Sequence, residues 1–183
     1  MGYVYLYTGT GGGKTANALG LALRTVGHGG KAVIVQFLKW RRDTGEVLVK
    51  EKLGDLYEIR NFGREVWLGK EAKTEEFGDE KFAVESITDC DRELAEQALA
   101  FASEAMAEKP QLLVLDELCL AAHWKLLGTK KILALLSKVP EETTVIMTGR
   151  YSPQALIDRA DFVNVVQDVK MPKKSKLTKG IQY

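Results

Sequence analysis

The chain has 183 residues, a formal net charge of +1, 45% hydrophobic residues and 28% charged residues. This balance predicts one globular domain over 1–183 with a full hydrophobic core, and it excludes a disordered or fibrous protein. A net charge near zero gives no strong attraction to nucleic acid, so none is expected as a partner. No signal peptide is expected and no apolar run approaches the roughly 20 residues that span a bilayer, so we expect no membrane association and a cytoplasmic location.

The first predicted elements are a strand, a glycine-rich loop and a helix. An apolar run predicts a strand over 3–7, and a helix is predicted over 14–28 before a glycine-rich break. The loop between them reads T-G-T-G-G-G-K-T, close to the P-loop motif G-x-x-x-x-G-K-[ST] except that Thr8 replaces its first glycine. The P-loop residues predicted to bind nucleotide are Thr8, Gly9, Thr10, Gly11, Gly12, Gly13, Lys14 and Thr15.

The chemistry of this loop follows from its backbone. Glycines let successive N–H groups turn inward toward phosphate oxygens, and the start of the following helix adds a partial positive charge. Lys14 is expected to neutralise the polyphosphate, and Thr15 is expected to ligate Mg²⁺. A glycine-rich turn without a ligand is the alternative interpretation.

Residues 32–37 predict a second strand, which completes a βαβ unit. Further apolar runs at 112–115 and 143–147 are continuous rather than alternating, as in strands covered on both faces. We therefore predict an α/β, P-loop NTPase-like fold with a mostly parallel central sheet and helices on both faces. Residues 43–89 have weak periodicity and scattered glycines, which predicts an irregular insertion of short helix, short strand and loops.

The run at 112–115 ends in two carboxylates, Asp116 and Glu117. A helix over 91–109 is predicted before it. In P-loop proteins such a strand neighbours the loop, so Asp116 is expected to hold the metal directly or through water. Glu117 could orient water, bind the metal, contact the second substrate, or simply be an acid favoured at a helix N-terminus.

Arg150 follows the strand predicted at 143–147, at the edge of the sheet where ligands bind in α/β proteins. An arginine there can reach phosphate with two parallel hydrogen bonds, although an ordinary surface arginine is the alternative. A further helix is predicted after Pro153. The basic tail at 168–183 carries several lysines, which could approach triphosphate or simply be solvated.

Several of these blocks resemble the corrinoid adenosyltransferases of the CobA, CobO and BtuR type, in the same order along the chain. The P-loop and L-A-L-R-x-V-G-H-G occur over 8–29, and V-x-Q-F-x-K is similar to 33–39. L-x-V-L-D-E-L occurs over 112–118, and T-G-R-x-x-P-x-x-L-I-D-x-A-D-x-V resembles 148–163. The ending over 179–183 is similar to the family's terminal G-I-x-Y.

The resemblance implies transfer of the 5′-deoxyadenosyl group of ATP to the Co(I) of a reduced corrinoid, with release of triphosphate, in adenosylcobalamin biosynthesis or salvage. It implies Mg²⁺ or Mn²⁺, an electron-donor reductase such as a flavoprotein, and a homodimer. The residues implied are Lys14, Glu117 and Arg150 in catalysis; Arg24, Gln36, Lys39, Trp67 and Arg150 with the P-loop in binding ATP or corrinoid; and Thr15, Asp116 and Glu117 at the metal.

The chain departs from the family pattern at three places. Gly12 stands where family loops usually carry a lysine, and Ala16 stands where they carry a second threonine. The aromatic segment G-F-x-W near the corrinoid is poorly reproduced in 61–67, where only Trp67 aligns.

Co(I) is itself a strong nucleophile, so the protein needs no nucleophilic side chain, and the sequence has no G-x-S-x-G motif. The two histidines, His28 and His123, lie outside any D-x-H-x-x-G cobalt-ligating motif.

The sequence leaves three other kinds of function open. An ordinary P-loop kinase or ATPase would use Asp116 and Glu117 to activate a hydroxyl group or water. A nucleotide-dependent switch would bind ATP and a partner without chemistry. The basic tail leaves an RNA-binding module as a third reading, opposed by the near-neutral net charge. Cys90 and Cys119 lack C-x-x-C spacing, which argues against the zinc lid of a thymidine-kinase-like enzyme.

Overall fold

The structure is a computed structural model. It describes residues 2–69, 73–77, 80–172 and 178–181, and in 67–84 it describes the backbone alone. In chain order the elements are β1 (Val4–Thr8), α1 (Lys14–Gly27), β2 (Ala32–Phe37), α2 (Gly45–Leu48), α3 (Lys50–Leu53), a 3-10 turn (Gly54–Leu56), β3 (Tyr57–Phe62), β4 (Trp67–Gly69), β5 (Lys73–Phe77), β6 (Glu80–Ser86), α4 (Asp89–Ala107), β7 (Leu112–Asp116), α5 (Leu118–His123), α6 (Thr129–Leu136), β8 (Thr144–Thr148), α7 (Gln154–Arg159) and β9 (Phe162–Val165).

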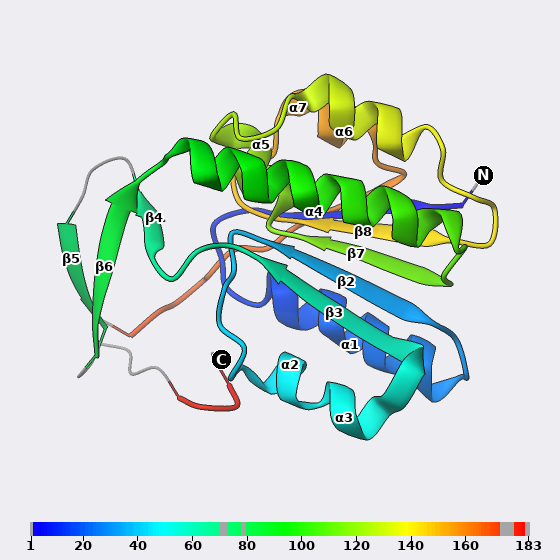
Figure 1. The fold of residues 1–183 in the computed structure, drawn as a ribbon, viewed down its shortest axis with the longest axis horizontal. Helices are drawn as coiled ribbons and strands as arrows, with labels where there is room; N and C mark the ends of the chain where they lie inside the picture. The colour runs from blue at the N-terminus through cyan, green and yellow to red at the C-terminus, as the bar shows by residue number, and fades with distance from the viewer. Residues whose placement is uncertain (1, 70–72, 78–79, 173–177, 182–183) are drawn as a thin grey trace.

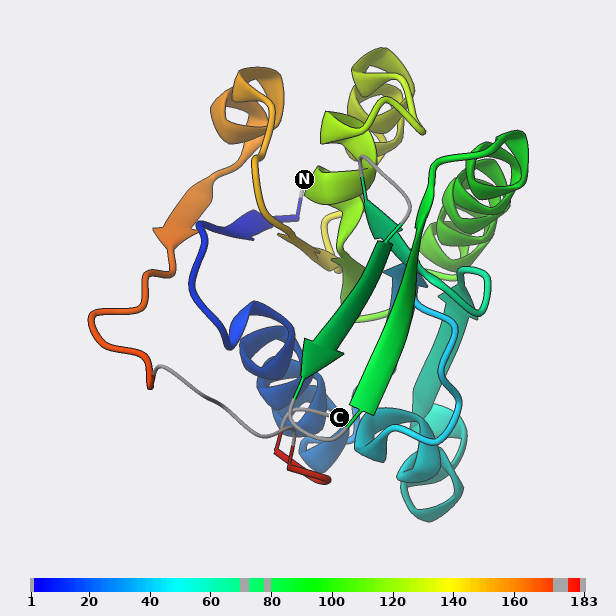
Figure 2. The same ribbon diagram turned by 90° about the vertical axis from the view of Figure 1, so that its left-hand side faces the viewer.

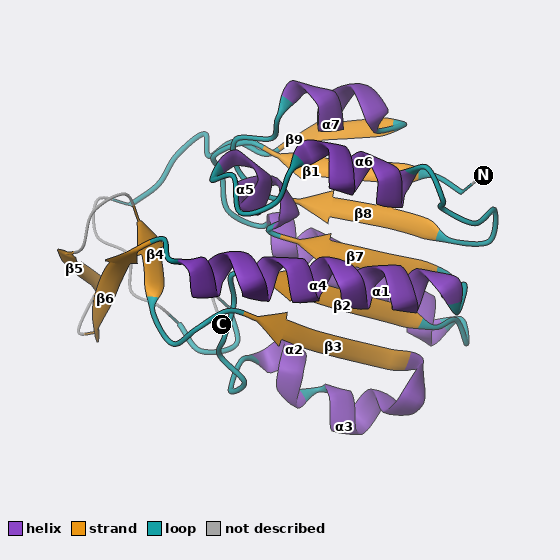
Figure 3. Ribbon diagram, turned by 45° about the horizontal axis from the view of Figure 1, so that its top comes forward, coloured by secondary structure: helices purple, strands orange, loops and turns teal. Residues whose placement is uncertain are grey.

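Six parallel strands form the main sheet in the order β3-β2-β7-β8-β1-β9 (Figure 3). Helices cover both of its faces (Figures 1 and 3). The predicted α/β fold is therefore confirmed. The four apolar runs became β1, β2, β7 and β8, because each is buried almost completely between two layers of helices.

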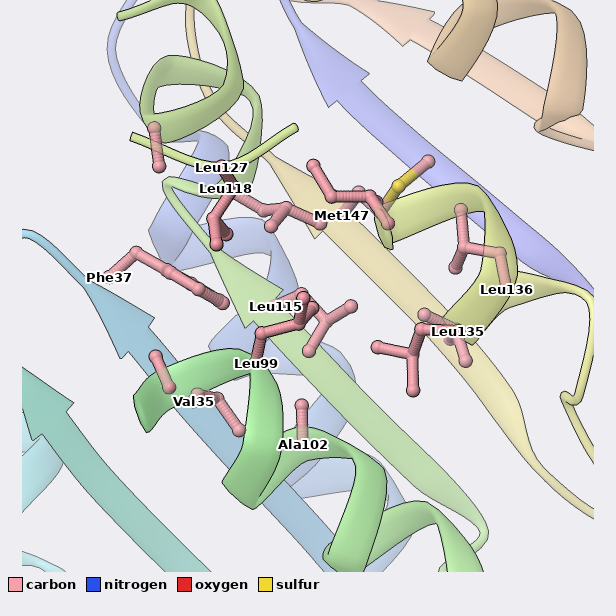
Figure 4. Close-up of a cluster of buried hydrophobic side chains, with 14 of the residues drawn as sticks. Val35, Phe37, Leu99, Ala102, Leu115, Leu118, Leu127, Leu135, Leu136 and Met147 are labelled. Carbon is pink, nitrogen blue, oxygen red and sulfur yellow. The ribbon is translucent and has the colours of Figure 1, made fainter. Parts of the chain in front are cut away.

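Alternate residues of each strand belong to two separate cores. One core holds Val35, Phe37, Leu115 and Met147 against side chains of α4, α5 and α6, as Figure 4 shows, and Leu156 of α7 belongs to the same core. The other holds Ile34, Val114 and Ile146 against α1, with α2 and α3 packed beside it. Small residues of α1, Ala18 and Ala22, are fully buried, so this helix packs closely on the sheet.

The end of β7 lies beside the P-loop, as expected, although β7 and the P-loop strand β1 are not adjacent in the sheet. β8 pairs with β1 on one side and with β7 on the other, so it separates them. The chain crosses from β1 through α1 to β2 and leaves two strand positions between, which β7 and β8 fill later. The carboxylate at the end of β7 therefore reaches the P-loop through the start of α1, which packs against this part of the sheet, and not through pairing of β7 with β1.

The stretch 43–89 contains more regular structure than its sequence predicts. β3 joins the main sheet as an edge strand in register with β2. β4, β6 and β5 form a second sheet that projects beyond the carboxyl ends of the main strands (Figures 2 and 3). Across the described residues, no helix is long and apolar enough to cross a bilayer.

Candidate functional site

A row of polar side chains lies along the carboxyl edge of the main sheet. Gln36 pairs in register with Asn61 of β3 on one side and with Asp116 of β7 on the other. Leu115 pairs with Met147, so the next residues of the two strands, Asp116 and Thr148, also lie side by side. Residues that lie side by side in a parallel sheet point their side chains to the same face. The side chains of this row point to the face covered by α1.

Asp116 is the centre of this row and is fully buried. Its Oδ1 accepts from Thr148 Oγ1 (2.6 Å) and from Thr15 Oγ1 (2.8 Å). Its Oδ2 accepts from Lys39 Nζ (2.7 Å) and from Gln36 Nε2 (3.0 Å). Burial alone would raise the pKa of Asp116, but the Lys39 ammonium and the hydrogen bonds outweigh burial, so the pKa lies below its usual range. Asp116 is therefore an ionised carboxylate.

The P-loop brings Lys14 and Thr15 to this edge. Gly9 and Gly13 adopt positive φ angles of 99° and 92°, which only glycine reaches without strain. Gly13 precedes α1, whose first turn, described in full, has no acidic residue to offset the helix dipole. Lys14 is 5% exposed, and its Nζ donates to Gly11 O at 2.5 Å. Burial lowers the pKa of Lys14 most, and the charge of nearby Arg150 lowers it further.

Glu117 is held in an unusual backbone conformation directly after Asp116. Its φ of 60° is left-handed, which is costly for a residue with a side chain. Its N–H donates to Thr148 Oγ1 at 2.9 Å, while its Oε2 is buried without a hydrogen-bond partner. Burial, and then the charge of Asp116, raise the pKa of Glu117. It precedes α5 but makes no side-chain capping bond, so helix capping does not account for it.

Not every residue implied by the resemblance lies at this edge. Arg150 is exposed just past β8, near enough to act on the charges of Lys14 and Glu117. Arg24 lies in the last turn of α1, about 15 Å along the helix axis from Lys14, and is exposed. Trp67 begins β4, and its side chain lies outside the described part of the chain.

Two partners of the row, Asn61 and Thr148, were not predicted as site residues from the sequence. Asn61 Nδ2 donates to Gln36 Oε1 (3.0 Å) and to Arg41 O (3.1 Å), which fixes the Gln36 amide toward Asp116. Thr148 was noted beside Arg150, yet it is Thr148 that contacts Asp116. The signal for Thr148 was a polar residue at the carboxyl end of an apolar strand, whereas Asn61 lies in a strand of mixed polarity that gave no such signal.

The oxygen atoms at this edge fit a hard divalent cation. Thr15 offers a hydroxyl, Asp116 offers an ionised carboxylate, and Glu117 offers a buried oxygen without a partner. Mg²⁺ and Mn²⁺ prefer such ligands. Among the described residues, no group of three or more His, Cys, Asp and Glu side chains could hold a metal by itself. A cation here would therefore take its remaining ligands from phosphate oxygens and water.

Comparison with known proteins gives the same family for the whole chain. Residues 1–183 match the family described as ATP:corrinoid adenosyltransferase BtuR/CobO/CobP. The corrinoid adenosyltransferase of Escherichia coli K12 is 30% identical over 169 residues, which cover 92% of this chain and 78% of that protein. That of Pseudomonas aeruginosa is 31% identical over 187 aligned positions, covering 100% and 84%. The corrinoid adenosyltransferase CobA of Salmonella typhimurium is 31% identical, covering 92% and 78%. The chain belongs to the ATP:corrinoid adenosyltransferase family.

Proposed function

We propose that this protein transfers the 5′-deoxyadenosyl group of ATP to the Co(I) of a reduced corrinoid and releases triphosphate, in the biosynthesis or salvage of adenosylcobalamin. Family membership over the entire chain supports this reaction. The observation that carries the proposal is the hydrogen bond between Thr15 of the P-loop and Asp116, which joins the phosphate-binding loop to an ionised carboxylate.

The residues of the edge act on the leaving triphosphate in this proposal. Because Co(I) supplies the electron pair, the protein has to align C5′ with cobalt and stabilise negative charge on the departing phosphates. Lys14 and Arg150 supply positive charge on that side, and the P-loop N–H groups bind phosphate oxygens. Burial, and then the charge of Asp116, raise the pKa of Glu117, and a cation bound beside it would favour the ionised form.

Metal binding is part of the proposal. Thr15 and Asp116 would hold Mg²⁺ or Mn²⁺, with Glu117 beside them. When bound, the cation neutralises charge on the triphosphate. Gln36 is fully buried and bonded to Asp116, so its proposed role is to orient that carboxylate rather than to contact ATP. Lys39, with a side chain 31% exposed, both balances Asp116 and can reach a bound anion.

The second substrate is proposed to bind beyond the carboxyl edge, on the side of the second sheet, where Trp67 begins β4. Support comes from the general rule that ligands of open α/β sheets bind at this edge. A flavoprotein or similar reductase as electron donor, a homodimer and a cytoplasmic location are proposed from the family resemblance.

The test is an anaerobic assay with ATP, Mg²⁺ and chemically reduced cob(I)alamin. Formation of a light-sensitive cobalt–carbon bond is followed in the visible spectrum, and triphosphate is measured in parallel. We expect equal amounts of the two products. ATP converted to ADP with the corrinoid unchanged would contradict the proposal and favour a kinase or ATPase.

Lys14→Ala is expected to lower kcat/KM at least about 100-fold, because it removes a charge placed against the leaving group. Lys138→Ala changes an exposed lysine that follows α6, and should leave kcat/KM within about twofold of wild type. Equal losses in both variants would mean that the effect is not specific to the P-loop.

A further inference from the structure

The segment that follows β9 returns across the P-loop and packs directly on it. Val166 N–H donates to Thr8 O (2.8 Å), and Gly11 N–H donates to Val166 O (3.0 Å). A Cβ atom at Gly9 would lie 2.3 Å from Val166 O, and one at Gly11 would lie 2.8 Å from the carbonyl carbon of Gln167. Glycine at these two positions therefore permits a backbone contact that any side chain would obstruct.

This contact carries the Asp168 carboxylate onto the loop. Gly12 N–H donates to Asp168 Oδ1 at 3.2 Å. The loop is otherwise open at this point, since a Cβ atom at Gly12 or Gly13 would meet no described atom within 4 Å. Backbone N–H groups of such loops are the donors that hold phosphate oxygens. The Asp168 carboxylate thus occupies the Gly12 N–H, a donor that a phosphate oxygen would otherwise use.

The charge of Asp168 also acts on Lys14. Burial and Arg150 lower the pKa of Lys14, whereas the carboxylates of Glu117, Asp168 and Asp116 oppose that change. Lys14 is meanwhile turned back on its own loop through Gly11 O. Before nucleotide binds, negative charge from the protein, including Asp168, therefore already acts on the cation of the P-loop.

We propose that Asp168 is an internal competitor of the triphosphate chain, resting on Gly12 N–H without nucleotide and leaving when a polyphosphate binds. A carboxylate and a phosphate oxygen both only accept hydrogen bonds and both carry negative charge, so they cannot share this N–H and they repel one another. Residues 167–172 are exposed, so the segment can withdraw without uncovering the core. The inference rests on the proposed function, because its consequence is easier release of the triphosphate product.

Binding of inorganic triphosphate and of ATP, each with Mg²⁺, tests the competition by calorimetry on the full chain. Asp168→Asn keeps the size of the side chain and an oxygen acceptor but removes the charge. We expect Kd for triphosphate to fall about fivefold, the size expected for removing one like charge at short range in water. This gain should shrink at high salt, because exposed charges are screened. Asp168→Glu, which keeps the charge, should bind close to wild type.

Glu141→Gln is the matched control, since it removes an exposed carboxylate before β8, at the opposite edge of the sheet, and should leave Kd unchanged. Weaker or unchanged binding by Asp168→Asn, with normal binding by the wild type, would overturn the competition alone. Weaker binding would indicate that Asp168 instead holds the loop in its binding conformation. Failure of the wild type to bind either polyphosphate would overturn both this inference and the proposed function.

Discussion

Two buried carboxylates in this protein are each held by a cation, and they differ in what remains unpaired around them. Asp116 at the carboxyl edge pairs with Lys39, and Asp91 at the start of α4 pairs with Arg64. Around Asp91 the charged groups are paired by hydrogen bonds. Arg64 donates to Asp91 (2.8 Å), to Glu85 and to Ser86 O (3.0 Å). Around Asp116, the adjoining Glu117 Oε2 is buried and unpaired.

This difference separates a structural ion pair from a candidate site. A closed network such as the one at Arg64 gains nothing from a ligand, and it fastens the chain entering and leaving the second sheet to α4. An unpaired buried acid costs free energy that a bound cation can offset. Burial and charge alone do not distinguish the two regions, whereas unsatisfied hydrogen-bonding capacity does.

The largest effect is expected from Asp116→Asn. The substitution removes the charge that balances Lys39 and replaces an acceptor of four hydrogen bonds. We expect triphosphate binding with Mg²⁺ to weaken about 100-fold and the free energy of unfolding to fall by about 2–3 kcal/mol. Calorimetry and urea unfolding measure the two effects. Unchanged binding would remove the edge from the candidate site.

Asp91→Asn should cost stability without affecting binding. Asp91 also accepts from Thr88 N and Thr88 Oγ1, both at 2.8 Å, which caps α4. We expect the free energy of unfolding to fall by about 2 kcal/mol near neutral pH, with Kd for triphosphate within about twofold of wild type. Asp89→Asn, at a side chain 97% exposed, is the control and should change stability by less than about 0.5 kcal/mol.

The pH dependence of the Asp91 variant follows from its pKa. Burial alone would raise the pKa of Asp91, but the hydrogen bonds from Arg64 and Thr88 outweigh burial and hold it below the usual 3.8. The unfolded chain therefore binds a proton at Asp91 more readily than the folded protein. The stabilisation is complete above about pH 4 and is lost as the pH falls through the folded value. The stability difference between wild type and Asp91→Asn should shrink under acid conditions; a constant difference would contradict the pairing.

The smallest effect is expected at the end of β3, beside the Arg64 network. The Arg60 guanidinium lies 4.2 Å from the centre of the Phe101 ring, and Arg60 also pairs with Glu58 at 3.0 Å. Arg60→Gln should lower the free energy of unfolding by about 0.5–1 kcal/mol. Arg92→Gln, another partly exposed arginine, should be close to neutral. A loss above about 2 kcal/mol would contradict this estimate and make the contact between Arg60 and Phe101 a main attachment of β3 to α4.

Much of the fold could be predicted because the central strands are continuous apolar runs. Edge strands lack this signal: β9 over Phe162–Val165 is exposed at every residue, and β3 alternates buried and exposed positions. β5 over Lys73–Phe77 is mostly charged and polar. The order of the strands also could not be predicted from local sequence patterns, because it depends on which positions in the sheet are filled by later strands.

The candidate site was predictable where a motif carries it and not where folding alone assembles it. Lys14, Thr15 and Asp116 were found from local spacing and lie together in the structure. Asn61 and Asp168 reach the site from positions with no motif, through sheet register and through the return of the chain over the P-loop. Arg24 was implied by the family string, yet the helix carries it away from the edge.

The placement of β8 between β1 and β7 has a consequence for synthesis of the chain. Thr15 and Asp116 are 101 residues apart in sequence, and Thr148 lies a further 32 residues beyond Asp116. Closing such long loops costs entropy before any contact repays it. A growing chain therefore carries its phosphate-binding motif long before Asp116 and Thr148 are made, and has no complete nucleotide site until β8 has left the ribosome. Nucleotide would then select and stabilise chains whose main sheet is already formed, rather than guide the early steps of folding.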